Sequence, residues 1–90
     1  MYTIIMLILY DEPKRLRNLE KHGLDFADLT ISFFEAARIA DAKLGRFVAV
    51  GYFDDQLVVA VVFRPMGTEA LNVISMRPAS KKERKNYAED

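Results

Sequence analysis

The chain has no cysteine and only one histidine, His22. The absence of cysteine excludes a disulfide framework and any metal site built from thiolates. A structural zinc site takes about four Cys or His ligands, so we expect no metal and no other cofactor. Serine residues are present, but none lies in the nucleophile-elbow motif of serine hydrolases. These absences leave chemistry based on cationic side chains.

The chain also lacks a glycine-rich phosphate loop, an excess of charge of one sign, and a long hydrophobic run. The 13 Lys and Arg residues balance 13 Asp and Glu residues, which argues against a uniformly basic nucleic-acid wrapper. Residues 1–10 are strongly apolar, but a bilayer span needs roughly 20 such residues. They also lack a positively charged start and a cleavage site, as a signal peptide would have. We therefore expect a cytoplasmic protein without a membrane segment.

The 90 residues, of which 51% are hydrophobic and 29% charged, predict one globular domain over residues 1–90. Hydrophobic periodicity and turn residues predict its elements. We expect helices over 11–22, over 25–37 and from Ser80 through Tyr87, and strands over 3–9, 38–42, 46–53, 56–63 and 69–77. A tight hairpin at Asp54-Asp55 and a turn over 65–68 join the later strands. The order predicts an α+β fold, an antiparallel sheet with its helices on one side.

Charge is unevenly distributed along the chain. Residues 14–22 hold four basic residues and one acidic residue, and residues 64–87 hold six basic and two acidic. Residues 24–63 hold three basic and six acidic residues. If the two basic segments meet, a protein of zero net charge still presents a positive field to phosphates. The alternative is that these charged faces are simply solvated.

The first predicted helix has a polar face. On a helical wheel with about 100° per residue, Leu16 and Leu19 lie on one side, and an arc of about 100° holds Lys14, Asn18, Lys21 and His22. His22 lies at the border of this arc. It is a candidate general base or hydrogen-bond donor, or else a residue at the helix C-terminus that interacts with the helix dipole.

Two arginines end predicted strands. Arg77 ends the last strand and Arg64 the one before it, so a hairpin would place them at opposite ends. A guanidinium fixed at a strand end can bind a phosphate through two hydrogen bonds; alternatively, Arg77 is a surface arginine paired with an acid. Metal-free RNA cleavage needs a deprotonated 2′-hydroxyl, a protonated 5′-oxygen and stabilised phosphate oxygens. Arg, Lys and one His or Tyr can supply all three.

Three segments carry a family resemblance. The first runs Tyr10-Asp11-x-x-Lys14-x-x-x-Asn18-x-x-Lys21-His22-Gly23-Leu24-x-Phe26. It resembles the N-terminal signature of the BrnT toxins, W-D-x-x-K-x-x-x-N-x-x-K-H-G-[VI]-x-F. Arg46-Phe47-Val48-Ala49-Val50-Gly51 resembles their R-F-x-x-x-G strand, and residues 74–84 resemble their I-S-A-R-x-A-[ST]-x-x-E-R ending, with Tyr87 also matching. Arg64 stands where the family has threonine, so we retain it on charge and position alone.

The resemblance implies a RelE-like endoribonuclease of a type II toxin–antitoxin system that cleaves cellular RNA and halts translation. It implies a BrnA-type antitoxin with a ribbon-helix-helix half, in a complex of two toxins and two antitoxins that binds operator DNA. We expect catalysis by His22, Lys21, Arg64 and Arg77, and substrate binding by Lys14, Asn18, Arg46, Lys81, Lys82 and Tyr87. The alternative is a non-catalytic module that binds RNA or a partner within a DNA-bound repressor complex.

Overall fold

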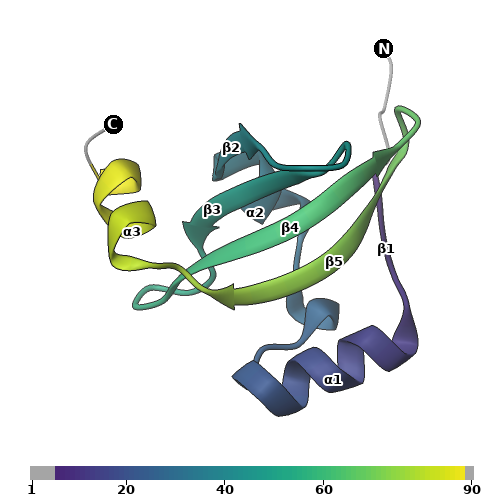
Figure 1. Ribbon diagram of the computed structural model, residues 1–90, viewed down its shortest axis with the longest axis horizontal. Helices are drawn as coiled ribbons and strands as arrows, with labels where there is room; N and C mark the ends of the chain where they lie inside the picture. The colour runs from purple at the N-terminus through teal and green to yellow at the C-terminus, as the bar shows by residue number, and fades with distance from the viewer. Residues whose placement is uncertain (1–5, 89–90) are drawn as a thin grey trace.

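A five-stranded sheet in the order β1-β5-β4-β3-β2 forms the centre of the molecule (Figure 1). The computed structural model describes residues 6–88. Its elements, in chain order, are β1 (Leu7–Tyr10), α1 (Glu12–His22), the 3-10 helix η1 (Phe26–Asp28), α2 (Ile31–Ala36), β2 (Arg38–Asp41), β3 (Phe47–Tyr52), β4 (Val58–Met66), β5 (Ala70–Pro78) and α3 (Lys81–Ala88). The predicted α+β class is confirmed. Residues 3–5 of the first predicted strand lie outside the described residues.

The sheet is mixed, so the prediction of an antiparallel sheet is wrong in one place. β1 runs parallel to β5, with Leu7 opposite Ala70 and Tyr10 opposite Val73, whereas all other neighbours are antiparallel. Hairpin-linked strands must be antiparallel. β1 and β5 are separated by most of the chain and are not joined by a hairpin, so either direction is open to them. The side-chain pattern of a strand does not reveal its direction.

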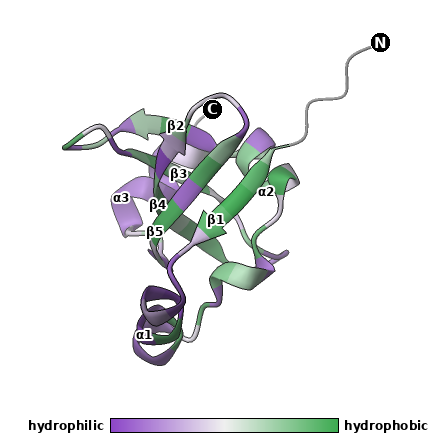
Figure 2. Ribbon diagram, turned by 90° about the vertical axis from the view of Figure 1, so that its right-hand side faces the viewer, coloured by the Kyte–Doolittle hydropathy of each residue, from purple (hydrophilic) through white to green (hydrophobic). Residues whose placement is uncertain are grey.

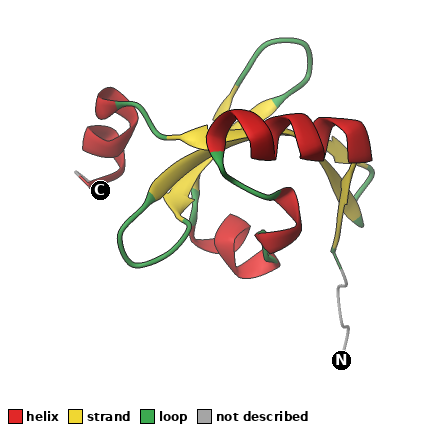
Figure 3. Ribbon diagram, turned by 90° about the horizontal axis from the view of Figure 1, so that it is seen from below, coloured by secondary structure: helices red, strands yellow, loops and turns green. Residues whose placement is uncertain are grey.

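The two faces of the sheet differ in how they are covered. The core face packs Val59, Val61 and Val73 against Phe26 and Phe33 from the segments that follow α1. The opposite face, here the open face, has α3 over one end, where Tyr87 packs on Val50 and Ala60. The expectation that all helices lie on one side is therefore wrong, because α3 lies across the sheet from α2. Its place apart from the other helices is visible from below (Figure 3).

The first predicted helix is confirmed at both ends. The Asp11 side chain accepts a hydrogen bond from the backbone N–H of Lys14, as an N-cap does. Gly23 ends the helix at φ 69°, a left-handed conformation that glycine adopts without strain. The second predicted helix is divided into η1 and α2. Asp25 caps η1 and Thr30 caps α2, and the extended backbone between the two pieces breaks the helix.

The two later turns differ in detail from the prediction. The loop at Asp54 is longer than the predicted tight hairpin and covers residues 53–57. It is held by the Asp54 carboxylate, which accepts hydrogen bonds from the backbone N–H groups of Gln56 and Leu57 at 2.8 and 2.9 Å. β4 continues through Met66, so the next turn lies over 67–69 around Gly67 at φ 67°. Among residues 6–88, no helix is long and apolar enough to cross a membrane.

Candidate functional site

Helix α1 is attached to the edge of β5 through a buried amide. Within the described residues β1 pairs with residues 70–73, and past that point Asn18 contacts the strand edge. Its side-chain oxygen accepts a hydrogen bond from the backbone N–H of Met76 at 3.1 Å, and its nitrogen donates to the Leu24 carbonyl at 3.2 Å. Asn18 is 8% exposed. The amide therefore fixes the second turn of α1 beside the last residues of β5.

This contact corrects the expected orientation of α1. The helical wheel placed Leu16 on the buried side, but Leu16 is 51% exposed and the polar residue Asn18 is the buried one. Most residues of α1 are hydrophilic (Figure 2). Asn18, expected to bind substrate, is instead engaged with the backbone at both ends of its amide. The polar arc is thus the side of the helix that faces the sheet.

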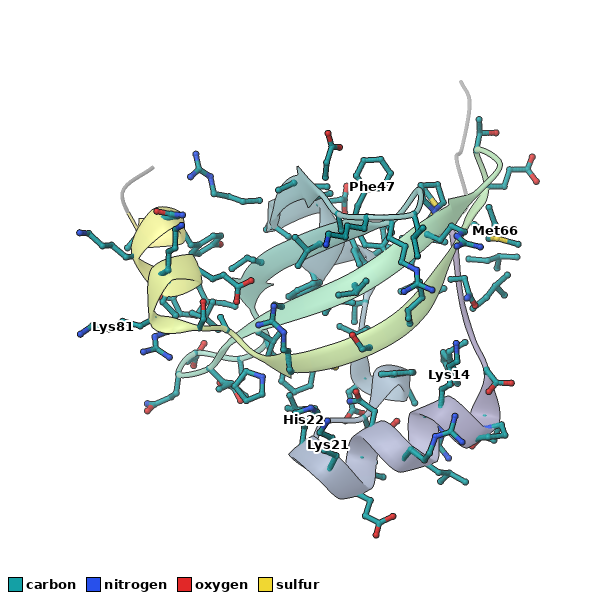
Figure 4. The ribbon with its side chains drawn as sticks, in the orientation of Figure 1. Lys14, Lys21, His22, Phe47, Met66 and Lys81 are labelled. Carbon is teal, nitrogen blue, oxygen red and sulfur yellow. The ribbon has the colours of Figure 1, made fainter. Side chains whose placement is uncertain are left out.

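The basic residues of this arc lie on either side of Asn18. Lys21 and His22 lie at the C-terminal end of α1 and Lys14 at the opposite end, with all three on the side of the helix toward the sheet (Figure 4). Lys14 and Lys21 are exposed and His22 is half-buried. Since Asn18 bonds to Met76, and His22 lies one turn beyond Asn18, the fold brings the imidazole to the C-terminal end of β5.

Arg77 follows Met76 and points to the open face. It lies opposite Ala60, a residue of the small cluster under α3. Its guanidinium donates to both carboxylate oxygens of Glu83, from Nη1 at 2.7 Å and from Nη2 at 3.0 Å. The hydrogen bond from Arg77 and the backbone N–H of Ser80 hold the pKa of Glu83 down at about 2, and the pKa of Arg77 is raised by the same pair. Arg77 therefore stays charged and directionally fixed.

The predicted capping box of α3 forms around this pair. The Ser80 N–H donates to Glu83 Oε1 at 2.8 Å, and the Glu83 N–H donates to Ser80 Oγ at 3.1 Å. The alternative that Arg77 pairs with an acid is confirmed, but Glu83 was predicted only as a helix cap and was not identified as that acid. The sequence did contain a hint of this contact, because Glu83 follows Arg77 by six residues with Pro78 between them. Only the bend of the chain after β5 shows that the two side chains meet.

Arg64 lies at the other end of the open face, as the hairpin predicted. It pairs across strands with Asn72, and its Nη2 donates to the Leu44 carbonyl in the β2–β3 loop at 3.3 Å. Arg77 pairs with Ala60, which precedes Arg64 by four residues on β4. Four residues of strand span about 13 Å. The two arginines therefore occupy separate places on the open face, each with its own hydrogen-bond partner.

The remaining predicted residues are scattered. Lys81 and Lys82 are exposed on α3, and Lys81 points away from α1 (Figure 4). Tyr87 packs edge-to-face on Tyr52 with ring centroids 5.6 Å apart. Arg46 lies before β3, and its Nε atom is buried without a hydrogen-bond partner among the described residues.

The described part of the chain contains no group of three or more His, Asp or Glu side chains placed to hold a metal ion. The end of α1, with Lys21 and His22, is fixed beside the last residues of β5, and the fixed guanidinium of Arg77 is on the same stretch of that strand. A guanidinium and an ammonium group can neutralise a phosphate, and an imidazole can transfer a proton at neutral pH. This end of the molecule therefore has the groups for reactions of phosphodiesters.

Comparisons with known proteins agree with this reading. The family model for the ribonuclease toxin, BrnT, of type II toxin–antitoxin systems matches residues 10–83. The crystal structure of the Brucella abortus ribonuclease toxin, BrnT, is similar over 86% of this chain and 99% of its own, with 49% identity and a TM-score of 0.79. No curated protein matches the chain.

Proposed function

Since this chain belongs to the BrnT family of ribonuclease toxins from type II toxin–antitoxin systems, we propose that it cleaves cellular RNA at the C-terminal end of β5. One observation carries the location: the hydrogen bond between Asn18 and Met76 brings the end of α1, with Lys21 and His22, next to the strand end that holds Arg77. The cleavage we propose is internal to the RNA and needs no metal ion.

The proposed reaction uses the 2′-hydroxyl of the RNA as the nucleophile. The 2′-oxygen forms a bond to phosphorus and loses its proton to a base, while the bond from phosphorus to the 5′-oxygen breaks. The leaving 5′-oxygen takes a proton, which gives a 2′,3′-cyclic phosphate and a free 5′-hydroxyl. Arg77 stabilises the charge on the phosphate oxygens, and His22 or Lys21 transfers the proton or orients the substrate.

More distant cations have a different role in this proposal. Arg64 binds a second phosphate of the strand, because it lies about 13 Å along β4 from the row of Arg77. Lys14, Lys81 and Lys82 guide RNA through their charge, which predicts that their contribution weakens at high salt.

The partner of this toxin belongs to the proposal as well. A type II toxin is neutralised by an antitoxin, and we propose a BrnA-type protein with a ribbon-helix-helix half that binds operator DNA. Two toxins and two antitoxins would form the complex, and its work on RNA and operator DNA would take place in the cytoplasm. We also propose that the arrangement of β-strands and helices is that of the RelE-like toxins.

The test incubates the purified protein with a structured RNA, with and without EDTA, beside an Arg77→Ala variant. The proposal expects cleavage that survives EDTA and is lost in the variant. A Lys43→Ala variant, which loses one positive charge in the β2–β3 loop, is the matched control and should cleave normally. Tight binding with intact RNA would favour a non-catalytic RNA-binding module instead. Cleavage that stops in EDTA would contradict the metal-independent mechanism.

A further inference from the structure

The guanidinium of Arg77 is held along one edge. It has five N–H donors in a rigid plane. Glu83 accepts from Nη1 and Nη2, which together form the end of the guanidinium, and the Pro78 carbonyl lies 3.4 Å from Nη1. The bonds on Nη1 use both of its hydrogens. They leave the other edge of the plane, made by Nε and the outer hydrogen of Nη2.

Within residues 6–88, no protein group accepts a hydrogen bond from this second edge. Its two parallel N–H groups match the spacing of two oxygens of a phosphate. The side chain of Arg77 is 40% exposed and that of Glu83 is 23% exposed. A phosphate can therefore reach the open edge without displacing the carboxylate from the other one.

The carboxylate itself is fixed by groups other than Arg77. Ser80 donates its backbone N–H to Glu83, and the preceding residue, Ala79, donates its own to the Val58 carbonyl at 2.9 Å. At the far end of α3, Arg38 donates to the Asn86 carbonyl at 2.8 Å. The start of α3 is thus tied to β4 and its end to β2, so Glu83 occupies a defined place before RNA arrives.

We propose that Glu83 is a positioning residue for cleavage: it holds the end of the Arg77 guanidinium so that the Nε/Nη2 edge faces the scissile phosphate. This inference rests on the proposed ribonuclease function. Glu83 acts through Arg77 and does not touch the RNA. Its negative charge lies beside the bound polyanion and weakens the attraction for RNA. The two effects of Glu83 therefore have opposite signs, with orientation raising the rate of cleavage and charge lowering the affinity.

The experiment measures single-turnover cleavage by a Glu83→Gln variant over a range of protein concentrations. Glutamine still accepts from Ser80 in a capping box, but it does not hold a guanidinium as a carboxylate does. We expect the maximal rate to fall about 10-fold, since small misplacements of a positioned group cost one to two orders of magnitude. The concentration giving half-maximal rate should stay the same or fall.

Two variants serve as controls. Glu20→Gln makes the same change in charge on the exposed surface of α1 and should keep the maximal rate. Ser80→Ala removes the Oγ acceptor of the cap but keeps the backbone N–H bond to Glu83, so it weakens α3 and leaves the pair with Arg77. It should lower the unfolding temperature with less than about a 3-fold loss of rate, an expectation from its small capping energy.

Two results would overturn the inference. One is a Glu83→Gln protein with an unchanged maximal rate. Another is an equal loss of rate in Ser80→Ala at equal loss of stability, because this would show that Glu83 only supports the helix. Failure of the proposed function would look different. The unchanged protein would leave RNA intact, or the Arg77→Ala variant would cleave RNA as fast as the unchanged protein. In either case the inference about Glu83 fails together with the proposed function.

Discussion

The two ends of the open sheet face each carry an arginine, and they hold it in different ways. At the β5 end, Arg77 makes two hydrogen bonds to the Glu83 carboxylate, and the end of α1 is fixed nearby through Asn18. At the other end, Arg64 is exposed and makes one longer bond to the carbonyl of Leu44 in a loop. Groups that stabilise a transition state act best when they are held in place beforehand. This difference is the reason we propose the chemistry at the Arg77 end and binding of the RNA strand at the Arg64 end.

The largest expected effect tests this assignment directly. Arg77→Ala should reduce the rate of RNA cleavage about 1,000-fold, since it removes the fixed charge that faces the phosphate. Arg64→Ala should reduce it less than about 10-fold and act mainly on binding, because an exposed contact to a second phosphate adds affinity more than rate. Single-turnover rates of the two variants check both values. Equal losses would contradict the assigned difference.

The next effect concerns the imidazole brought to the same end by α1. His22→Ala should lower the cleavage rate about 100-fold, if the imidazole transfers a proton in the reaction. Lys21→Ala is the neighbouring comparison, and the larger loss identifies which of the two transfers the proton. Circular dichroism of both variants checks that α1 is intact. Full activity in both proteins would remove α1 from the mechanism.

A smaller effect should appear in stability. Asn18→Ala leaves the Met76 N–H and the Leu24 carbonyl without their partner, and an unsatisfied buried group costs about 1–3 kcal/mol. We expect the free energy of unfolding to fall by about 2 kcal/mol. Asn72→Ala, beside Arg64 on the open face, should change it by less than about 0.5 kcal/mol. Urea unfolding of the two variants measures the contrast. Similar values would mean that α1 is not anchored through this amide.

The smallest effect is a dependence of stability on pH. The pKa of Glu83 is lowered from 4.5 to about 2 by its bonds with Arg77 and Ser80. A carboxyl group with a lowered pKa stabilises the fold above its ordinary pKa, and this contribution is lost as the pH falls from about 4.5 toward 2. Because the pair is partly exposed, solvent screening reduces the contribution to about 1 kcal/mol. The free energy of unfolding should therefore fall less between pH 5 and pH 2 in the Glu83→Gln variant than in the unchanged protein, by about 1 kcal/mol. An identical acid loss in both proteins would contradict it.

Much of the fold could be predicted from local patterns in the sequence. The caps at Asp11, Gly23 and Ser80 depend on neighbouring residues, and the structure confirms them. The direction of β1 could not be predicted, because it depends on a pairing with β5 about sixty residues away. The break between η1 and α2 was missed, since the same apolar period runs through both pieces.

The candidate site shows the same division. Residue types and positions indicated Arg77 and its place at the other end of the hairpin from Arg64, and the family signature pointed to His22. The burial of Asn18 was missed because a wheel places leucines inside a helix by default, whereas an asparagine can satisfy the backbone of a free strand edge. The pair of Arg77 with Glu83 depends on the bend after β5, which local patterns do not specify.

The most direct test of the central claim is where RNA contacts the protein. A 2′-O-methyl oligoribonucleotide has no free 2′-hydroxyl to act as the nucleophile, so it binds without being cleaved, and NMR chemical shifts report the residues that it touches. The account predicts the largest changes at the Arg77 side-chain Nε–H and at His22, with smaller ones at Arg64. Changes centred on the outer surface of α3, around Lys81, with Arg77 and His22 unmoved, would contradict it.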